Sequence, residues 1–208
     1  MFGRPTWRRR EPVDELVLTI LSQNTNDANR DRAYKRLRDR FPKWETALDA
    51  PVEPIEEAIR PAGLSKLKSR RIRDILRWIE LTFGALDLTP LADLDDTEAI
   101  ELLTARNGIG VKTAAVLLAF AFDRDLCPVD THVHRIARRL GWVPEKTSAE
   151  KCFWSLRGMI PPGEAVAFHL NLLRFGRSYC TARGPRCGEC VLRDDCAWKD
   201  RALFEARE

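Results

Sequence analysis

The sequence lacks long apolar runs. Its most apolar stretch, residues 114–122 (AAVLLAFAF), is far shorter than the roughly 20 residues that a membrane-spanning helix needs. The basic N-terminal segment FGRPTWRRREP is not followed by the apolar segment that a secretory signal requires. We therefore expect no membrane partner and a cytoplasmic location.

Strand patterns are also missing. No segment alternates apolar and polar residues over more than a few positions, so no β-sheet is predicted. Apolar residues recur instead at helical spacing, as in the stripe formed by Ile72, Ile75, Leu76 and Ile79. Clusters of Pro and Gly cut these patterns into about ten short helices, a normal length distribution for helical proteins. The predicted fold class is all-α.

Charge of one sign is not in large excess, because 35 Lys and Arg face 31 Asp and Glu for a net charge of +4. The distribution is uneven: residues 60–77 carry seven basic groups and one acid, whereas residues 87–101 carry six acids and no base. Such asymmetry is compatible with a basic face for a polyanion. On charge alone, ordinary solvated helix faces explain it better.

The sequence has six cysteines, and the reducing cytoplasm that we expect makes metal ligands a better explanation for them than disulfides. Four of the six follow the spacing C-x6-C-x2-C-x5-C, at Cys180, Cys187, Cys190 and Cys196. Packing gives no reason to place four thiols so close together, so the spacing predicts a metal site. Spacing alone leaves zinc and iron–sulfur both open. The remaining two cysteines are interpreted as small buried residues.

Residues 102–118 read as two helices joined by Gly108-Ile109-Gly110. The glycines allow a tight turn and leave backbone N–H groups bare at the start of the second helix, where a phosphate can bind. By itself the pattern also fits an ordinary turn. Lys112 follows directly, and Asp130 lies ahead of a predicted helix over residues 131–140, where it suits an N-cap. Taken singly, Asp130 is better explained as a cap than as a catalyst.

Taken together, these residues resemble a known family. The run Gly108–Ala114 followed by Val129-Asp130-Thr131-His132 resembles the helix-hairpin-helix and following aspartate of the endonuclease III family of DNA glycosylases. The resemblance extends from about Val13 to Cys196 and includes the loop at residues 21–27 and the pair Gly63-Leu64. Departures from the family pattern occur at Asn24 and at Arg106-Asn107, which bear on substrate preference.

The resemblance implies two helical domains that flank a cleft. Residues 15–124 would form one domain, with the helix-hairpin-helix at about 102–118. Residues 1–14 and 125–208 would form the iron–sulfur domain. The four clustered cysteines would hold a [4Fe–4S] cluster, and the partner would be double-stranded DNA with damaged bases or abasic sites. We expect a monomer that associates with the nucleoid.

The resemblance also implies roles for single residues. Neutral Lys112 would attack C1′ of the damaged nucleotide, and the resulting Schiff base would permit β-elimination of the 3′ phosphate. Asp130 would stabilise the positive charge on the sugar and help to move protons. The implied DNA contacts are Gly108, Gly110, Val111, Thr113, Gln23, Asn24, Leu64, Arg183 and Arg186. The expected activity is that of a bifunctional glycosylase and abasic-site lyase acting on oxidised pyrimidines, such as thymine glycol.

Three alternatives stay open at the level of sequence. A monofunctional glycosylase would use Asp130 to activate water and Lys112 only to bind phosphate. A weaker relative would act mainly as an abasic-site lyase. A non-enzymatic module with iron–sulfur or zinc could recognise bent or damaged DNA through its basic segments, hairpin and metal loop, but binding alone does not require both Lys112 and Asp130.

Overall fold

The computed structural model describes residues 2–204. The α-helices are α1 (Pro12–Ser22), α2 (Asp27–Arg40), α3 (Trp44–Asp49), α4 (Val52–Ile59), α5 (Ser65–Phe83), α6 (Asp96–Thr104), α7 (Val111–Ala121), α8 (Thr131–Arg139), α9 (Ala149–Arg157) and α10 (Ala165–Ser178). Four 3-10 helices accompany them: η1 (Arg60–Ala62), η2 (Thr89–Asp93), η3 (Cys187–Glu189) and η4 (Lys199–Phe204). Residues 2–204 contain no β-strand, which confirms the all-α prediction.

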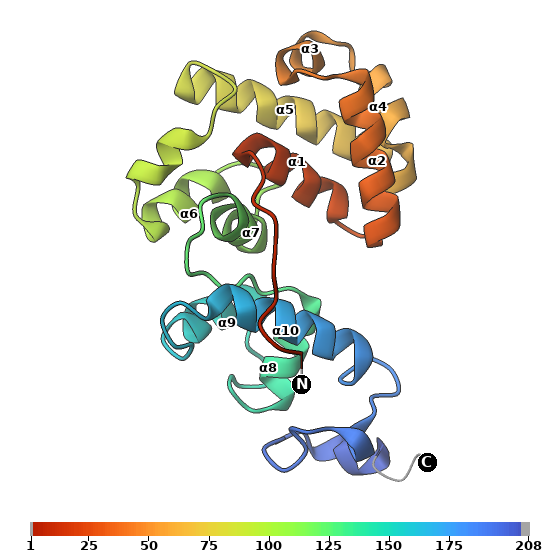
Figure 1. Ribbon diagram of the computed structural model, residues 1–208, viewed down its shortest axis with the longest axis vertical. Helices are drawn as coiled ribbons and strands as arrows, with labels where there is room; N and C mark the ends of the chain where they lie inside the picture. The colour runs from red at the N-terminus through yellow and green to blue at the C-terminus, as the bar shows by residue number, and fades with distance from the viewer. Residues whose placement is uncertain (1, 205–208) are drawn as a thin grey trace. The chain divides into compact units, whose positions relative to one another are not determined.

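The chain divides into two compact units (Figure 1). The helical unit is Arg8–Asp123, and the cysteine unit combines residues 2–7 with residues 124–204. Residues 8–14 thus group with the helical unit, whereas the sequence prediction had placed them with the iron–sulfur part. Two ion pairs connect this segment to the helical unit: Arg9 pairs with Asp123 at 3.1 Å, and Arg10 pairs with Glu15 of α1 at 3.3 Å.

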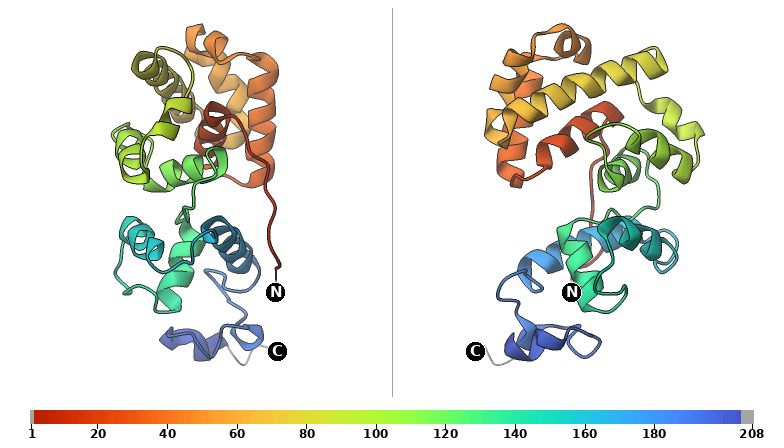
Figure 2. Two further views of the ribbon diagram at one scale, coloured as in Figure 1. Left: turned by 60° about the vertical axis from the view of Figure 1, so that its left-hand side comes forward. Right: turned by 180° about the vertical axis from the view of Figure 1, so that it is seen from behind.

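In the helical unit, α1 forms the centre of the core. It packs against α2, α5 and α7, and Figures 1 and 2 show it lying between α5 and α7. Leu16, Val17, Ile20 and Leu21 are fully buried, which accounts for the apolar run in this helix. Because these contacts fix α1 on several sides, the loop that follows it starts from a rigid base.

Helix α5 is amphipathic and packs against α3 and α4 as well as α1. The predicted stripe of Ile72, Ile75, Leu76 and Ile79 is buried, while Arg70 and Arg77 are exposed on the other side of the helix. Burying four such aliphatic side chains contributes on the order of 1.5–3 kcal/mol each. The helix therefore holds its first turn firmly, and that turn follows Gly63-Leu64.

Helices α6 and α7 form the predicted hairpin. Asp95 caps α6, and with Glu98 it makes a reciprocal capping box. Helix α7 then buries most of its residues, including Leu117 and Leu118, against α1 and α6. The capped N-terminus of α6 and the burial of α7 fix the position of the hairpin turn between the two helices.

In the cysteine unit, α8 packs against α9 and α10. Asp125 fixes the start of α10, because its carboxylate accepts the backbone N–H of Gly163 at 2.6 Å and that of Ala165 at 2.9 Å. The buried His169 of α10 donates from Nδ1 to the Pro128 carbonyl at 2.7 Å. These contacts position the segment that leads into α8. Across residues 2–204, no helix has both the length and the apolarity to cross a membrane.

Candidate functional site

The hairpin turn presents an open helix N-terminus. Gly108 has φ of +94°, and a Cβ at this position would overlap the Arg71 side chain. Gly110 is the N-cap of α7 in ordinary extended geometry and brings no side-chain cap. The first backbone N–H groups of α7 therefore have no acceptor within the helix or from a cap. Such a terminus, with its positive dipole end, can hold a phosphate.

The predicted hairpin residues differ in exposure. Lys112 is exposed in the first turn of α7, beside the open amides. Val111 is half-buried, and the Thr113 side chain is buried. Contacts of Val111 and Thr113 with DNA would therefore involve their backbone amides more than their side chains. Arg106, one of the departures from the family pattern, places its guanidinium over the Trp78 ring, 5.6 Å from the ring centre.

The loop after α1 carries Gln23 and Asn24. Gln23 is half-buried, and its Oε1 accepts a hydrogen bond of 2.6 Å from Arg71 Nη1. Asn24 is exposed and has φ of +52°, in the left-handed region that asparagine tolerates better than other residues with a Cβ. The Gln23 side chain is thus fixed, while that of Asn24 points to solvent.

Leu64 is a surface residue and not part of the core. Its side chain is 56% exposed, and its φ of +49° lies in the left-handed region. A large apolar side chain in strained backbone at the start of α5 is poorly explained by packing. The exposure excludes a core role and leaves the side chain accessible to a ligand, while the wedge role in DNA stays a prediction.

Lys68 was not predicted to have a role of its own. This residue of α5 is only 1% exposed, and its ammonium donates to the carbonyls of Leu21 at 2.9 Å and Ala62 at 2.8 Å. Burial, with the nearby Arg71 guanidinium as the second cause, lowers the pKa of Lys68. Lys68 thus ties the end of α1 to the segment before Leu64. Its spacing of four from Ile72, on the apolar stripe, was the signal that could have revealed it.

Asp130 is the N-cap of α8, as predicted. One carboxylate oxygen, Oδ1, accepts the backbone N–H of His132 at 2.9 Å and that of Val133 at 2.8 Å. The bonds of this cap involve only Oδ1, so Oδ2 can serve other chemistry. The cap fixes the carboxylate relative to the helix.

Hydrogen bonds connect the start of α8 to the cysteine loop. His132 Nδ1 accepts from Arg135 Nη2 at 3.1 Å, and the same guanidinium donates to the Cys180 carbonyl at 2.9 and 2.7 Å. Burial lowers the pKa of Arg135. The helix that begins at Asp130 is therefore anchored directly to the first cysteine of the cluster motif.

The four predicted metal ligands come together. Their thiols line one hollow that is otherwise mainly apolar, formed with Ile136, Leu140, Phe175, Tyr179 and Trp198. Within residues 2–204, no three His, Cys, Asp or Glu side chains converge on a point that could hold a single ion. A lone zinc, with Zn–S bonds of about 2.3 Å, would draw the sulfurs to one point. Thiols spread around a hollow fit a multi-iron cluster with four Cys ligands better.

Arg139 adds positive charge to this hollow. Its Nη1 donates to Cys180 Sγ at 3.3 Å, and its guanidinium lies over the Trp198 ring, 3.9 Å from the ring centre. Burial raises the pKa of the Cys187 thiol, with Cys180 adding to the effect and Arg139 opposing it. Burial also raises the pKa of Cys190. Because a cysteine binds iron as the thiolate, ligation has to offset these pKa shifts, and the positive charge of Arg139 assists.

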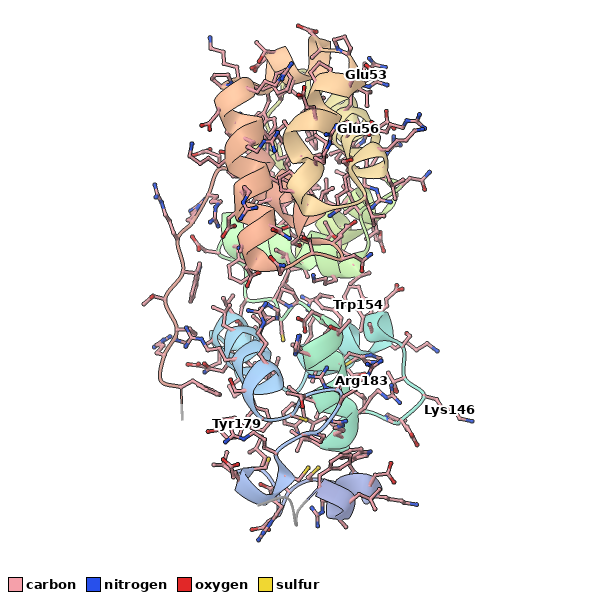
Figure 3. The ribbon with its side chains drawn as sticks, turned by 90° about the vertical axis from the view of Figure 1, so that its right-hand side faces the viewer. Glu53, Glu56, Lys146, Trp154, Tyr179 and Arg183 are labelled. Atoms are coloured by element: carbon pink, nitrogen blue, oxygen red, sulfur yellow. The ribbon has the colours of Figure 1, made fainter. Side chains whose placement is uncertain are left out.

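The two arginines predicted to contact DNA from this loop are not equivalent. Arg186 forms a forked pair with Glu189, at 3.0 and 2.7 Å, and lies over the Tyr179 ring. Arg183 is exposed; it is labelled with Tyr179 in Figure 3. Arg183 is therefore the better candidate for a phosphate contact, because the charge of Arg186 is already paired.

Comparison with known proteins decides the family. Residues 17–162 match the HhH-GPD superfamily of base excision DNA repair proteins. Endonuclease III of Thermotoga maritima is 31% identical over 191 residues, which cover 92% of this chain and 85% of that protein. The chain belongs to the endonuclease III family. It is a base excision DNA repair protein of the endonuclease III type, as the motifs predicted.

Further matches agree with the endonuclease III assignment. Residues 180–196 match the iron–sulfur binding domain of endonuclease III, which confirms the predicted [4Fe–4S] cofactor. A solved structure of a trapped endonuclease III–DNA covalent intermediate has a TM-score of 0.83 at 28% identity, covering 97% of this chain and 91% of that one. A candidate DNA glycosylase of Arabidopsis thaliana is 37% identical over 178 residues. This chain spans only 58% of that plant protein.

Proposed function

We propose that this protein is a bifunctional DNA glycosylase and abasic-site lyase that acts on oxidised pyrimidines in duplex DNA. The observation that carries the proposal is the exposed Lys112 in the first turn of α7, next to amides without a cap. The covalent DNA intermediate trapped with an endonuclease III supports it, because a covalent link requires a nucleophile on the protein.

The hairpin would hold a phosphate of the damaged strand. The amides of Val111, Lys112 and Thr113 supply donors, and the dipole of α7 favours the negative charge. Backbone amides carry no information about sequence, so they fix only the register of the DNA. This places the duplex without restricting which sequence surrounds the lesion.

Lys112 would act as the nucleophile. Its neutral amine attacks C1′, the bond to the base breaks, and the base leaves with the electron pair and takes up a proton. The amine then loses one proton, and its lone pair expels O4′ from C1′. O4′ takes up a proton as the sugar ring opens, and a protonated Schiff base forms. Loss of a proton from C2′ expels the 3′ phosphate by β-elimination.

Asp130 would stabilise the positive charge that develops on the sugar. Its Oδ1 is engaged in the α8 cap, which leaves Oδ2 to face the charge or to accept a proton. Gln23 and Asn24 would meet the base that loses its partner, and Leu64 would fill the gap left by the extruded nucleotide. Arg183 would contact a phosphate beside the cysteine loop.

The cluster, held by Cys180, Cys187, Cys190 and Cys196, would supply a rigid cross-link for this loop. The chain's own part is to set the loop on α8, through Arg135 and Arg139. We propose a monomer in the cytoplasm, associated with the nucleoid, as the form that acts on DNA.

Borohydride trapping tests the proposal. Duplexes with one thymine glycol or one abasic site are incubated with the wild type, with Lys112→Gln, and with the control Lys146→Gln. Lys146 is also exposed, in the loop after α8, and is labelled in Figure 3. We expect covalent adducts on both substrates for the wild type and the control, and none for Lys112→Gln.

The substrates separate the alternatives. Adducts on the abasic site alone would contradict the glycosylase half of the proposal. Release of thymine glycol without any adduct would indicate a monofunctional enzyme. Binding without release or adducts would overturn the enzymatic assignment.

A further inference from the structure

Arg71 lies between two segments that the proposed function assigns to DNA. Its Nη1 donates to Gln23 Oε1 at 2.6 Å, on the loop after α1. Its Nε, Cδ and Cγ lie against Gly108, so closely that no Cβ fits there. One half-buried side chain thus touches both the base-facing loop and the hairpin.

The same helix fixes the backbone of that loop. Lys68 lies three residues before Arg71 on α5 and donates to the carbonyl of Leu21, just before Gln23. It also holds the carbonyl of Ala62, ahead of Leu64. With the backbone held by Lys68, the hydrogen bond from Arg71 determines how the Gln23 side chain is oriented.

The chemistry of the Arg71 guanidinium determines which end of the Gln23 amide faces it. A guanidinium has five N–H donors and no acceptor, so it can bond only the amide oxygen of Gln23. The oxygen is therefore turned toward Arg71 and uses one of its lone pairs there. The NH2 group lies on the other branch of the amide, so Gln23 presents its donors on the side away from Arg71.

We propose that Arg71 is a positioning residue that holds Gln23 as a hydrogen-bond donor, so that the base opposite the lesion is read through one of its acceptor atoms. The inference rests on the proposed function, in which Gln23 meets that base. Arg71 acts through Gln23 and not through a phosphate. The exposed Arg77, six residues further along α5, has no such contact and is the matched control.

The test measures binding, so it does not depend on catalysis. Duplexes carry a stable abasic analogue, tetrahydrofuran, opposite either adenine or its isostere 4-methylbenzimidazole, which has the shape of adenine but lacks the acceptors N1 and N3 of the six-membered ring. We expect the wild type to bind the adenine duplex about fivefold more tightly, the effect of one hydrogen bond. Arg71→Met should reduce this ratio to about one, whereas Arg77→Met should keep it.

Two further variants show whether Arg71 acts through Gln23. Gln23→Leu should also abolish the preference, and adding Arg71→Met to it should change the ratio no further. Arg71→Lys keeps a donor and should restore part of the preference. The dependence of binding on salt should stay the same in Arg71→Met, since loss of a phosphate contact would lower the slope by about 0.9.

The outcomes distinguish the two proposals. A wild type that binds the abasic analogue no better than intact duplex contradicts the proposed function. A wild type that binds it well, with the same base ratio in Arg71→Met, overturns the role of Arg71. A lower salt slope in that variant would also overturn it and make Arg71 a phosphate contact. Thermal melting of each variant shows that the fold is kept, and Arg71→Lys carries the test if Arg71→Met does not fold.

Discussion

Helices α7 and α8 each begin beside a candidate catalytic residue, but their N-termini are built differently. In α7 the cap is Gly110, which offers no side chain, and Lys112 follows. In α8 the cap is Asp130 itself, whose Oδ1 accepts two backbone N–H groups. The first terminus is open to an external anion, whereas the second is closed by the protein's own carboxylate.

The two termini show that a helix N-terminus can serve two opposite tasks. Free amides and a helix dipole attract a phosphate, so the open terminus suits binding. A carboxylate on the same kind of terminus satisfies the amides and is held in one orientation. The two helices also differ at their other ends, because α8 leads to Arg139, which contacts Cys180 Sγ, and α7 ends at Ala121 in the helical unit.

The largest expected effect concerns the end of α8 at the cysteine loop. Cys190→Ser should abolish the visible absorption of the cluster, whereas Cys152→Ala, at a buried cysteine of α9, should keep it. Hydrogen exchange should then rise in α8 and stay unchanged in α7, since only α8 is bonded to the loop. If Cys190→Ser changed hydrogen exchange by the same amount in α7 and α8, or in neither helix, the loop would not support α8.

The next effect separates the two jobs of Asp130. Asp130→Asn keeps a good cap but removes the charge, so melting should hardly change while base release falls about 10²–10⁴-fold. Asp130→Ala removes both the cap and the charge, so it should also lower the unfolding free energy by about 1 kcal/mol. Single-turnover kinetics measure base release in the two variants, and thermal melting measures their stability. Full activity in Asp130→Asn would show that Asp130 acts only as the cap of α8.

Gly110→Asp makes the start of α7 resemble that of α8. Gly110 has ordinary backbone angles, and a Cβ there meets nothing within 4 Å, so the substitution fits. The new carboxylate should occupy the amides and repel phosphate, weakening DNA binding about tenfold, or about 1.4 kcal/mol. Gly110→Ser supplies a neutral cap and should weaken binding less. Unchanged binding in both would mean that the amides do not hold a phosphate.

The last prediction concerns the stability of the fold and not activity or binding, and it compares the two hairpin glycines. Gly108→Ala should lower the unfolding free energy by about 1–2 kcal/mol, because its positive φ disfavours a Cβ and Arg71 fills the space. Gly110→Ala should lower it by only a few tenths of a kcal/mol. Denaturant titration of the two variants checks this order. Similar losses would contradict the close approach of Arg71 to Gly108.

Much of this protein could be predicted from local sequence. Helical periodicity revealed the all-α fold, and Asp130 was expected to cap its helix because short acceptor side chains favour that position. The cysteine spacing indicated a metal loop, although residue spacing left the metal open. These features depend on neighbours along the chain, and short-range physics governs them.

The roles of the charged side chains on α5 depend on how the helices pack together. The basic run at residues 60–77 looked uniform, yet Lys68 is buried under the end of α1, Arg71 bonds Gln23, and Arg77 is exposed. Likewise Arg186 pairs with Glu189 while Arg183 stays exposed. The partner of a charged residue cannot be predicted from the local sequence when it is distant in the chain, because the two residues meet only when their helices pack together.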